Sequence, residues 1–335
     1  MRVSIVVVTY ESAAALAALL PALRREMADG DELIVVDNAS TDGSAAAARA
    51  AGAHVIENAA NTGFAAACNQ GAAAATGDLL VFLNPDSVPE PGFRAAIAAP
   101  LTGGFDAWMG LVLDGDRINT SGGVVHFTAI AWAGQAGQPA AAAPAQPREV
   151  GFLSGACLAI PAATWRSLGG FEPAFFMYHE DVDLSLRLRL RGGRLGVAPA
   201  ARVDHDYAFA KGATKWRLLE RNRWATLLRT YPAPLLAALA PALLALELAL
   251  WPAAVAGGWG RAKALATLDV VRALPRLLAQ RRAIQATRRV GAGAFAAGLT
   301  ADLSSPYLGA AGRSTALRRA LDAYWRAVLA LLGGR

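Results

Sequence analysis

Residues 3–44 read VSIVVVTYESAAALAALLPALRREMADGDELIVVDNASTDGS, two apolar runs separated by a segment rich in alanine and leucine. The runs Val3–Val8 and Leu33–Val36 are continuous and apolar, which is typical of strands buried on both faces of a parallel sheet. Between them, leucines recur at helical spacing after Ser12, a residue type that favours the N-cap position. The order strand, helix, strand predicts a parallel βαβ unit with a right-handed crossover.

The same alternation continues to about residue 100. A helix is expected to begin at Ser40 or Thr41 and to end at Gly52. A strand over His54–Ile56, a helix over Gly63–Ala75 and a strand over Leu79–Leu83 are expected to follow. The predicted fold class is therefore α/β, with a mostly parallel, Rossmann-like sheet and helices on both of its faces.

Polar residues stand directly after three of these strands, in the segments Thr9-Tyr10-Glu11, Asp37-Asn38 and Asn84-Pro85-Asp86. Ligands of open α/β sheets bind at the carboxyl ends of the strands, so these segments mark the expected binding site. Further along the chain, Asp181–Arg191 is predicted to be a helix with an acidic first turn. Arg194–Val203 is predicted to be a strand that ends at Asp204-His205-Asp206.

The C-terminal third differs from the rest in charge and hydropathy. Residues 211–335 carry 19 Lys/Arg against 5 Asp/Glu, a net charge of +14, whereas residues 1–210 carry 13 against 21, a net charge of −8. The basic residues alternate with Leu/Ala runs rather than with stacking aromatics, which favours an anionic membrane surface over nucleic acid as the partner.

The apolar run 232–257 contains one charge, Glu247, and four prolines. A run of this length can span a bilayer, but the prolines and the glutamate favour a broken or interfacial helix pair that lies on the membrane or re-enters it. A spanning helix and an ordinary apolar core element remain the alternatives. On either side, Trp216–Tyr231 and Arg261–Arg289 are predicted to be basic amphipathic helices.

The composition favours a reducing compartment. Apolar residues make up 55 % of the chain and charged residues 17 %, and the mean hydropathy is +0.33. Cys68 and Cys157 stand in small or apolar runs and are expected to be buried thiols rather than a disulfide. The first residues are predicted to be a strand rather than an export signal. We therefore expect a cytoplasmic catalytic part.

Five segments together resemble glycosyltransferase family 2, which has the GT-A fold, and within it the rhamnosyltransferase-like branch. They are VSIVVVTYES (3–12), VVDNASTDGS (35–44), NTGFAAACNQG (61–71), LNPDS (83–87) and GGFEPAFFMYHEDVDLSLRLR (169–189). The resemblance covers about residues 3–230. It implies a catalytic domain over residues 1–215, with a nucleotide-binding half (1–100) and an acceptor half (101–215). Residues 216–335 would form a helical, membrane-associating region.

The resemblance implies a nucleotide-sugar site in the first half of this domain. Asp37 would accept a hydrogen bond from the base or the ribose, although an Asx turn or a helix cap also explains an aspartate before Asn38-Ala39-Ser40. The remaining residues implied in donor binding are Thr9, Tyr10, Glu11, Asn61, Gly63, Asn69, Asn84, Asp86 and Gly155. Gly155 would let the substrate approach the backbone closely, and simple packing is its other interpretation.

The resemblance also implies a divalent metal, Mg²⁺ or Mn²⁺, held by Asp86 and His205. Carboxylate and phosphate oxygens around such an ion would stabilise the diphosphate leaving group. The family's commoner motif is Asp-x-Asp, and here Asn84 stands in place of the first aspartate, which leaves one strong anionic ligand. Asp204 or Asp206 is expected to orient the imidazole of His205 if that side chain is a ligand.

By the same resemblance Asp181 is the general base, with Glu180 as the alternative. Acidic residues in the first turn of a helix also interact favourably with the helix dipole, which is the simpler explanation for them. As base, Asp181 would remove the proton of the acceptor hydroxyl while that oxygen attacks the anomeric carbon opposite the diphosphate, which inverts the anomeric centre.

The sequence thus predicts an inverting glycosyltransferase at the inner face of the cell membrane. Its donor would be dTDP-rhamnose or a UDP-hexose, and its acceptor a hydroxyl of a lipid-linked glycan or a polysaccharide. A sugar-1-phosphate nucleotidyltransferase is the second candidate, but residues 9–12 lack the Gly-rich, Arg-containing loop that such enzymes need. A degenerate, non-catalytic membrane scaffold is the third.

Overall fold

The computed structural model describes residues 1–99, 104–205, 213–303 and 314–333. Its contacts divide the chain into two compact units. Unit 1 comprises residues 1–123, 133–184 and 193–208, and unit 2 comprises residues 124–132, 185–192 and 209–335. The sequence composition predicts a single domain boundary, near residue 215. The two short segments of unit 2 that lie earlier in the chain could not be predicted, because the helices they pack with come later in the sequence.

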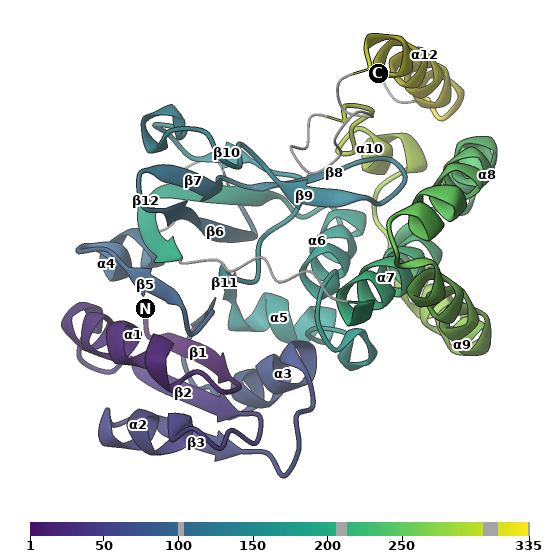
Figure 1. The fold of residues 1–335 in the computed structure, drawn as a ribbon. Coiled ribbons are helices and arrows are strands. Elements are labelled where there is room, and N and C mark those ends of the chain that lie inside the picture. The colour runs from purple at the N-terminus through teal and green to yellow at the C-terminus, as the bar shows by residue number, and fades with distance from the viewer. Residues whose placement is uncertain (100–103, 206–212, 304–313, 334–335) are drawn as a thin grey trace. The chain divides into compact units, whose positions relative to one another are not determined.

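Unit 1 is built on one long sheet (Figure 1). Its strands run in the order β10-β12-β6-β11-β4-β1-β2-β3, with β5 paired to β12 and β7 paired to β6. Their bounds are β1 Val3–Thr9, β2 Glu32–Asp37, β3 His54–Glu57, β4 Leu79–Leu83, β5 Ser87–Pro89, β6 Ala107–Asp114, β7 Arg117–Thr120, β10 Arg148–Glu149, β11 Cys157–Pro161 and β12 Leu195–His205. A separate two-stranded sheet contains β8 (Gly123–Val125) and β9 (Ala131–Ala133).

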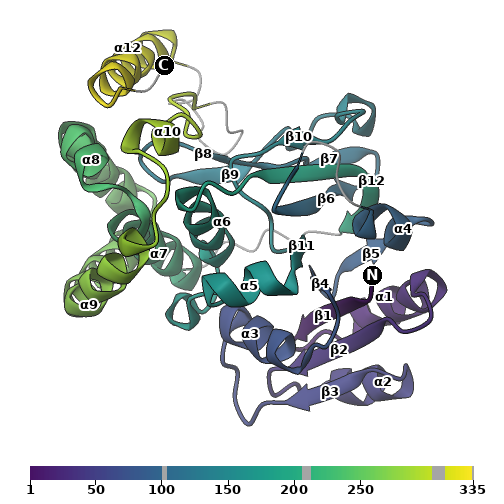
Figure 2. The same ribbon diagram turned by 180° about the vertical axis from the view of Figure 1, so that it is seen from behind.

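The first four strands are parallel, as the sequence predicts. β1 pairs with β2 on one side and with β4 on the other, and β2 pairs with β3. Helices α1 (Ala13–Glu26), α2 (Ser44–Ala50) and α3 (Phe64–Ala74) connect them. The strand order reverses after β3, so right-handed crossovers place α1 and α2 on one face and α3 on the other. Figure 2 shows α3 from behind.

Beyond β4 the sheet is mixed rather than parallel. β11 runs antiparallel to both β4 and β6, whereas β12 runs parallel to β6 with an irregularity between Ala198 and Arg202. The short connections in this half, such as the β6–β7 hairpin, permit antiparallel pairing without a crossover helix. Helices α4 (Phe93–Ala98) and α5 (Ala162–Leu168) and the single-turn helices Ala140–Ala142 and Pro173–Phe175 complete this part. Helix α6 (Glu180–Leu190) begins in unit 1, and its residues from 185 onward belong to unit 2.

Helix α1 begins directly after Ser12, as predicted, but the expected capping bond and the predicted start of α2 are wrong, and Asp42 explains both. Ser12 precedes α1, but its side chain makes no capping bond; instead Asp42 Oδ2 accepts a hydrogen bond from the amide of Ala13 at 2.8 Å. The other oxygen of Asp42 accepts hydrogen bonds from the amide and hydroxyl of Ser44. As a result, α2 begins at Ser44 rather than at Ser40 or Thr41. Asp42 lies 29 residues after Ala13, so this capping contact leaves no local pattern in the sequence.

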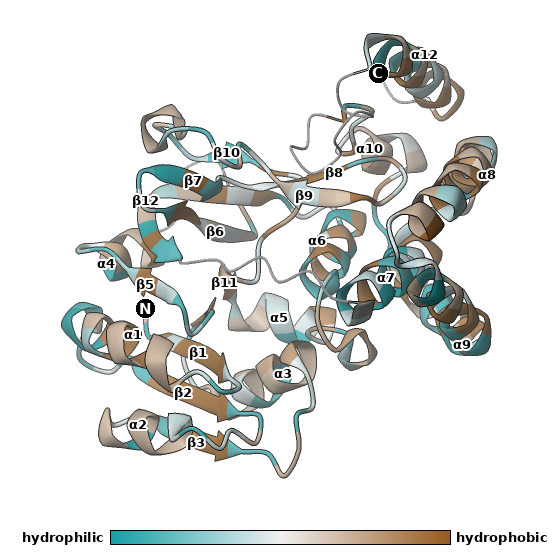
Figure 3. Ribbon diagram, viewed as in Figure 1, coloured by the Kyte–Doolittle hydropathy of each residue, from teal (hydrophilic) through white to brown (hydrophobic). Residues whose placement is uncertain are grey.

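Unit 2 is helical. Its helices are α7 (Ala213–Thr230), α8 (Ala233–Ala256), α9 (Gly260–Ala286), α10 (Ala292–Ala296) and α12 (Thr315–Leu331). The prediction of a broken helix pair over 232–257 is wrong, because α8 is one continuous helix that contains Pro241 and Pro252. Each of these prolines removes one backbone donor and strains the preceding turn without ending the helix. Figure 3 shows that α8 is largely apolar.

Candidate active site

The loops that carry the predicted site residues meet at one edge of the sheet in unit 1. Thr9 and Asp37 are in register at the ends of β1 and β2. Because β11 is antiparallel to β4, its first residue, Cys157, lies opposite Leu83 at the end of β4. The amide of Asn84 then donates a 3.2 Å hydrogen bond to the carbonyl of Ala156. The pairing of the strands therefore positions the loops after β1, β2 and β4 beside the loop before β11.

Asp37 is buried and bound mainly by its own neighbours. Its Oδ1 accepts hydrogen bonds from the hydroxyls of Thr9 and Ser40 at 2.8 and 2.6 Å, and its Oδ2 accepts one from the amide of Ser40 at 2.9 Å. This is the Asx-type arrangement that was the alternative interpretation. A carboxylate offers about four acceptor sites, so Oδ2 can accept one further hydrogen bond, and the donor contact of Asp37 stays a prediction.

Tyr10 and Glu11 differ in what they contact. Glu11 binds the loop after β2, since its Oε1 accepts from the amide of Thr41 at 2.8 Å and its own amide donates to Ser40 at 3.0 Å. Its φ of 49° is unusual for a residue with a side chain. Tyr10 is 55 % exposed, and its ring is free to stack on a planar base. Glu11 therefore shapes the loop that presents Tyr10.

Asn61 and Asn69 hold backbone in place. Asn61 Oδ1 accepts a hydrogen bond from the amide of Gly63 at 2.9 Å. The side chain of Asn69 bonds both the amide and the carbonyl of Phe171, each at 2.9 Å, across 102 residues of sequence. These contacts account for both asparagines structurally, and their predicted role in donor binding remains untested.

Gly63 is required by a close approach of two backbones. A Cβ at this position would lie 2.5 Å from Cδ2 of Phe176, and φ at Gly63 is +85°. Two residues after Gly63, the amide of Ala65 donates a 3.0 Å hydrogen bond to the carbonyl of Phe176. The start of α3 thus supports the loop that precedes the acidic residues of α6.

Asp86 and His205 lie together although 119 residues separate them. His205 Nε2 is 3.0 Å from Asp86 Oδ1 and 3.5 Å from Asn84 Nδ2. The imidazole is buried, whereas the Asp86 side chain is 36 % exposed and so reaches the surface. The antiparallel pairing of His205 with Ser87 in β5 brings the two together.

This donor set fits a divalent ion in part. A carboxylate oxygen of Asp86 and an imidazole nitrogen of His205, both ligand types of divalent ions, lie 3.0 Å apart. No group of three or more His, Cys, Asp and Glu side chains that could hold an ion occurs in the part of the chain that the structure describes. The protein would therefore supply two ligands, and the phosphates of a donor and water would supply the others.

Asp204 does not orient His205. Neighbouring residues of a strand point to opposite faces, and Asp204 is exposed where His205 is buried. Its Oδ1 accepts a 2.9 Å hydrogen bond from the amide of Gly115. The alternative residue, Asp206, lies outside the described residues.

Asp181 is fixed at both carboxylate oxygens. Its Oδ2 accepts a hydrogen bond from the amide of Gly155 at 3.1 Å, and its Oδ1 accepts one from the amide of Val182 at 2.8 Å. A Cβ on Gly155 would lie 3.1 Å from Phe64. Gly155 therefore lies close to both the Asp181 carboxylate and the Phe64 ring, and the same strand pairing sets it beside Asn84 and the loop that carries Asp86.

The two neighbouring carboxyls differ in acidity. Burial raises the pKa of Asp181 to about 6, against the opposing effect of the two backbone N–H bonds. Burial also raises the pKa of Glu180 well above its usual range, and the charge of Asp181 adds to the effect. Glu180 Oε2 has no hydrogen-bond partner among the described residues. With a pKa of about 6, Asp181 is mostly ionised at neutral pH, which fits it as the proton acceptor, whereas burial and the charge of Asp181 disfavour the ionised form of Glu180.

The backbone before α6 is strained, which the sequence does not reveal. Phe176, Tyr178 and His179 have φ values of 65°, 67° and 68°. Each such conformation costs free energy in a residue with a side chain, and such residues cluster at functional sites. Ser40 was also missed as a site residue, although its position three residues after Asp37 is a usual spacing for the amide that a capping side chain binds.

Comparison with known proteins agrees with this arrangement. The family model described as Glycosyl transferase family 2 matches residues 4–129, and the one described as Glycosyl transferase family group 2 matches residues 135–267. The chain is 28 % identical over 240 residues to the N-acetylglucosaminyl-diphospho-decaprenol L-rhamnosyltransferase of Mycobacterium tuberculosis, a match that covers 62 % of this chain and 77 % of the relative.

Two further proteins are similar over shorter shares of their length. The pre-mycofactocin glycosyltransferase of Mycobacterium tuberculosis is 32 % identical over 216 residues, which cover 61 % of this chain and 43 % of the relative. The crystal structure of GalNAc-T7 with UDP, GalNAc and Mn²⁺ superposes with a TM-score of 0.56 at 16 % identity, over 71 % of this chain and half of that one. At this identity, the likeness concerns the fold alone.

Proposed function

Because the chain belongs to glycosyltransferase family 2, as a rhamnosyltransferase-like enzyme with the GT-A fold and a nucleotide-sugar donor, we propose that it transfers one hexose, with inversion, to an acceptor hydroxyl. The proposed donor is dTDP-rhamnose or a UDP-hexose. The observation that carries the proposal is the Asp181 carboxylate, held by the amide of Gly155 at the same sheet edge as the Asp86–His205 pair.

The loops after β1 and β2 would bind the nucleotide. Tyr10 offers an exposed ring for the base, and Asp37 retains acceptor capacity on Oδ2. A divalent cation, Mg²⁺ or Mn²⁺, would be held by Asp86 and His205, with Asn84 beside them. When bound there, such an ion would stabilise the negative charge of the diphosphate.

Asp181 would act as the general base. It would take the proton of the acceptor hydroxyl while that oxygen forms a bond to the anomeric carbon from the face opposite the diphosphate. The bond from the anomeric carbon to the diphosphate oxygen would break, and its electron pair would leave with the diphosphate. Base catalysis of this kind accelerates a reaction typically about 10²–10⁴-fold.

The proposed acceptor is a lipid-linked glycan or a polysaccharide. The name of the rhamnosyltransferase relative gives a polyprenyl diphosphate sugar as its substrate. The net charge of +14 over residues 211–335 supports an anionic membrane surface as a partner, at the inner face of the cell membrane. We propose no nucleic-acid partner, because the basic residues alternate with apolar helix residues rather than with stacking aromatics.

Donor turnover without acceptor tests the proposal. Purified protein is incubated with dTDP-rhamnose, UDP-glucose, UDP-N-acetylglucosamine and UDP-galactose, with Mn²⁺, with Mg²⁺ or with EDTA, and the released nucleotide is measured. We expect slow hydrolysis of one donor with a metal, and faster release of nucleotide when a prenyl-diphosphate sugar acceptor is added. Binding of nucleotide without turnover in either condition would favour the scaffold. Formation of a nucleotide sugar from a sugar 1-phosphate would favour the nucleotidyltransferase.

A further inference from the structure

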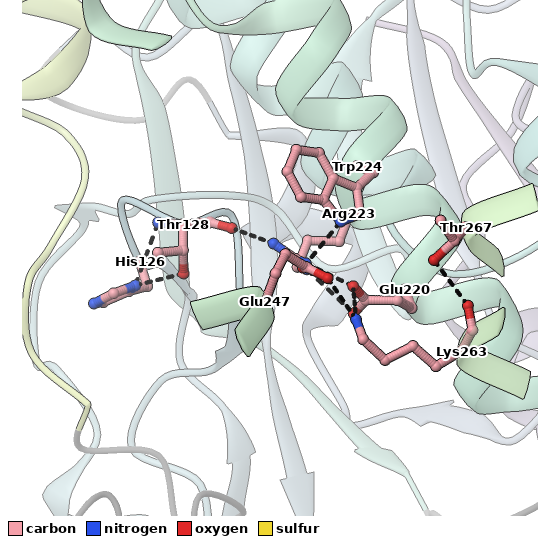
Figure 4. A network of polar contacts seen from close by, with 8 residues as sticks. All are labelled: His126, Thr128, Glu220, Arg223, Trp224, Glu247, Lys263 and Thr267. Carbon is pink, nitrogen blue, oxygen red and sulfur yellow. Dashed lines mark hydrogen bonds and ion pairs between the residues drawn. The ribbon is translucent and has the colours of Figure 1, made fainter. Parts of the chain in front are cut away.

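Helices α7, α8 and α9 of unit 2 share four charged side chains, three of them buried and the fourth, Glu247, partly buried, which Figure 4 shows together. Lys263 Nζ lies 3.0 Å from Glu220 and 2.7 Å from Glu247, and the guanidinium of Arg223 lies 2.6 and 2.5 Å from the same two carboxylates. We call these four residues the charge quartet. Lys263 is fully buried, and the two cations lower the pKa of Glu220 to about 2 against the opposing effect of its burial.

The quartet fixes the rotation of α8 about its own axis. Glu247 is the single charged residue of α8, and it continues the row of buried residues Leu235, Leu239 and Leu243 at a spacing of four. The indole N–H of Trp224 in α7 donates a further 3.1 Å hydrogen bond to Glu247. These bonds hold the face of α8 that carries Glu247 toward α7 and α9.

A second row of α8 is left exposed by this rotation. Leu244, Leu248, Trp251 and Val255 follow one another at spacings of three or four, and their exposed fractions are 62, 67, 39 and 68 %. We call them the outer row. Only 17 % of the most apolar 18-residue window of α8 is buried. Monomeric soluble proteins rarely expose such a contiguous apolar face.

Helix α9 adds a second exposed apolar row together with positive charge. Its exposed apolar residues are Leu268, Val271, Leu274 and Leu278, and its exposed arginines include Arg261, Arg272, Arg276 and Arg282. Trp216 of α7 stacks on Trp259 in the turn between α8 and α9, with ring centroids 4.9 Å apart. The turn is thereby packed against α7, and α8 and α9 leave it as fixed helices.

We propose that α8 and α9 form an in-plane membrane-binding surface, with the outer row inserted in the acyl chains of one leaflet and the α9 arginines at anionic headgroups. The inference rests on the proposed membrane association and specifies its geometry. An apolar face flanked by arginines matches an anionic bilayer in both hydropathy and charge. A protein partner of equal apolarity would not require the cations.

The charge quartet also opposes a spanning orientation of α8. Among the described residues, α8 is the one helix long and apolar enough to cross a bilayer. Crossing would carry Glu247 into the hydrocarbon, and would either break its bonds to Lys263 and Arg223 or draw these cations in with it. A buried ion pair that loses one partner is strongly destabilised. With the quartet intact, α8 lies parallel to the membrane.

Depth measurement separates the two orientations. Cys68 and Cys157 are buried, so a cysteine introduced as Ala237→Cys, Leu248→Cys or Val255→Cys is the accessible site for an NBD label. Labelled full-length protein is added to phosphatidylglycerol/phosphatidylethanolamine vesicles, and depth is measured by quenching with doxyl lipids. Residues 237 and 255 are separated by about 27 Å along a helix. We expect all three labels at the same shallow depth, and a gradient across the bilayer centre would overturn the proposal.

Vesicle flotation tests which residues bind. Leu248→Ser together with Val255→Ser should lower the partition coefficient at least about 100-fold, since each buried side chain contributes roughly a factor of ten or more. Leu331→Ser, in an exposed leucine outside both rows, is the matched control and should change partition less than about twofold. Equal loss in the control, or binding of the double variant like wild type, would overturn the proposal.

Donor hydrolysis separates this inference from the proposed function. Wild-type protein that hydrolyses its donor but stays unbound with anionic vesicles at low salt overturns the membrane surface and leaves the transferase intact. Protein that self-associates through the outer row, so that Leu248→Ser makes it monomeric while vesicles capture neither form, would assign the surface to a second copy of the chain instead.

Discussion

The acidity of Asp181 predicts a specific pH dependence of catalysis. Burial raises its pKa to about 6, and a base acts only when it is unprotonated. With that pKa, about a tenth of the molecules carry the carboxylate at pH 5, whereas an ordinary aspartate of pKa about 3.9 would be more than nine-tenths ionised. We expect kcat/KM to fall about tenfold between the neutral plateau and pH 5.

The assay is donor turnover with acceptor between pH 5 and pH 8, for wild type and three variants. Asp181→Asn should lower turnover at least about 10²-fold at every pH. Glu180→Gln removes a carboxyl that is not the proposed base and should keep the acid limb. Glu149→Gln, in an exposed pair with Arg194, is the control and should change nothing. An acid limb centred near pH 4, or its loss in Glu180→Gln alone, would refute the reasoning.

The same pKa shift has a consequence for stability. The folded state binds the Asp181 proton up to about pH 6, whereas the unfolded chain releases it near pH 3.9, so stability falls as the pH rises through this window. Asp181→Asn removes the buried charge. It should therefore raise Tm at pH 7.5 relative to wild type and change it little at pH 4. A lower Tm at pH 7.5 would mean that the two N–H bonds outweigh burial.

Three further perturbations test other parts of the structure. Asp86→Ala and His205→Ala should each abolish the extra thermal stabilisation by Mn²⁺ in the presence of nucleoside diphosphate, and stabilisation that persists in both would place the metal elsewhere. Gly63→Ala should destabilise unit 1 by more than Gly30→Ala. Both glycines have positive φ, but a Cβ would clash with Phe176 at Gly63 and meets nothing within 4 Å at Gly30. Thermal unfolding measures the difference in stability, which is expected to be about 1–3 kcal/mol. Lys263→Met leaves the buried Glu220 and the partly buried Glu247 short of a cation and should cost about 3–5 kcal/mol in urea unfolding. A loss under about 1 kcal/mol would mean that the quartet is solvated.

The parallel half of the fold could be predicted closely from the sequence. Val3–Thr9 and Leu79–Leu83 are buried throughout, so their apolar runs are uninterrupted and their ends coincide with polar residues. The approach of Asp86 to His205 was expected from the resemblance, and the structure brings the two side chains to 3.0 Å. The local sequence pattern was enough to predict strands that are completely buried and side chains that stand at the end of a strand.

Features that depend on contacts between residues far apart in the sequence could not be predicted from local patterns. The cap at Ala13 comes from Asp42, and Glu247 belongs to a network whose other members lie 16 to 27 residues away on two other helices. In the sequence, that glutamate marks an interruption of an apolar run. In the structure, it is the residue that orients the run, because its partners supply the positive charge that burial demands.

Gly155 links backbone geometry to the chemistry of the base. Desolvation alone would carry the pKa of Asp181 further upward, and a base that is protonated at neutral pH accepts no proton from the acceptor. The N–H bonds from Gly155 and Val182 oppose that rise and hold the pKa near 6. The bond from Gly155 depends on a close approach, since a side chain there would press on Phe64 at 3.1 Å. A residue with a Cβ at position 155 would move the amide away from Asp181, and the acid limb of the pH profile would shift upward. With Asp181 as the base, packing at one strand end would set the pH range in which the enzyme can act.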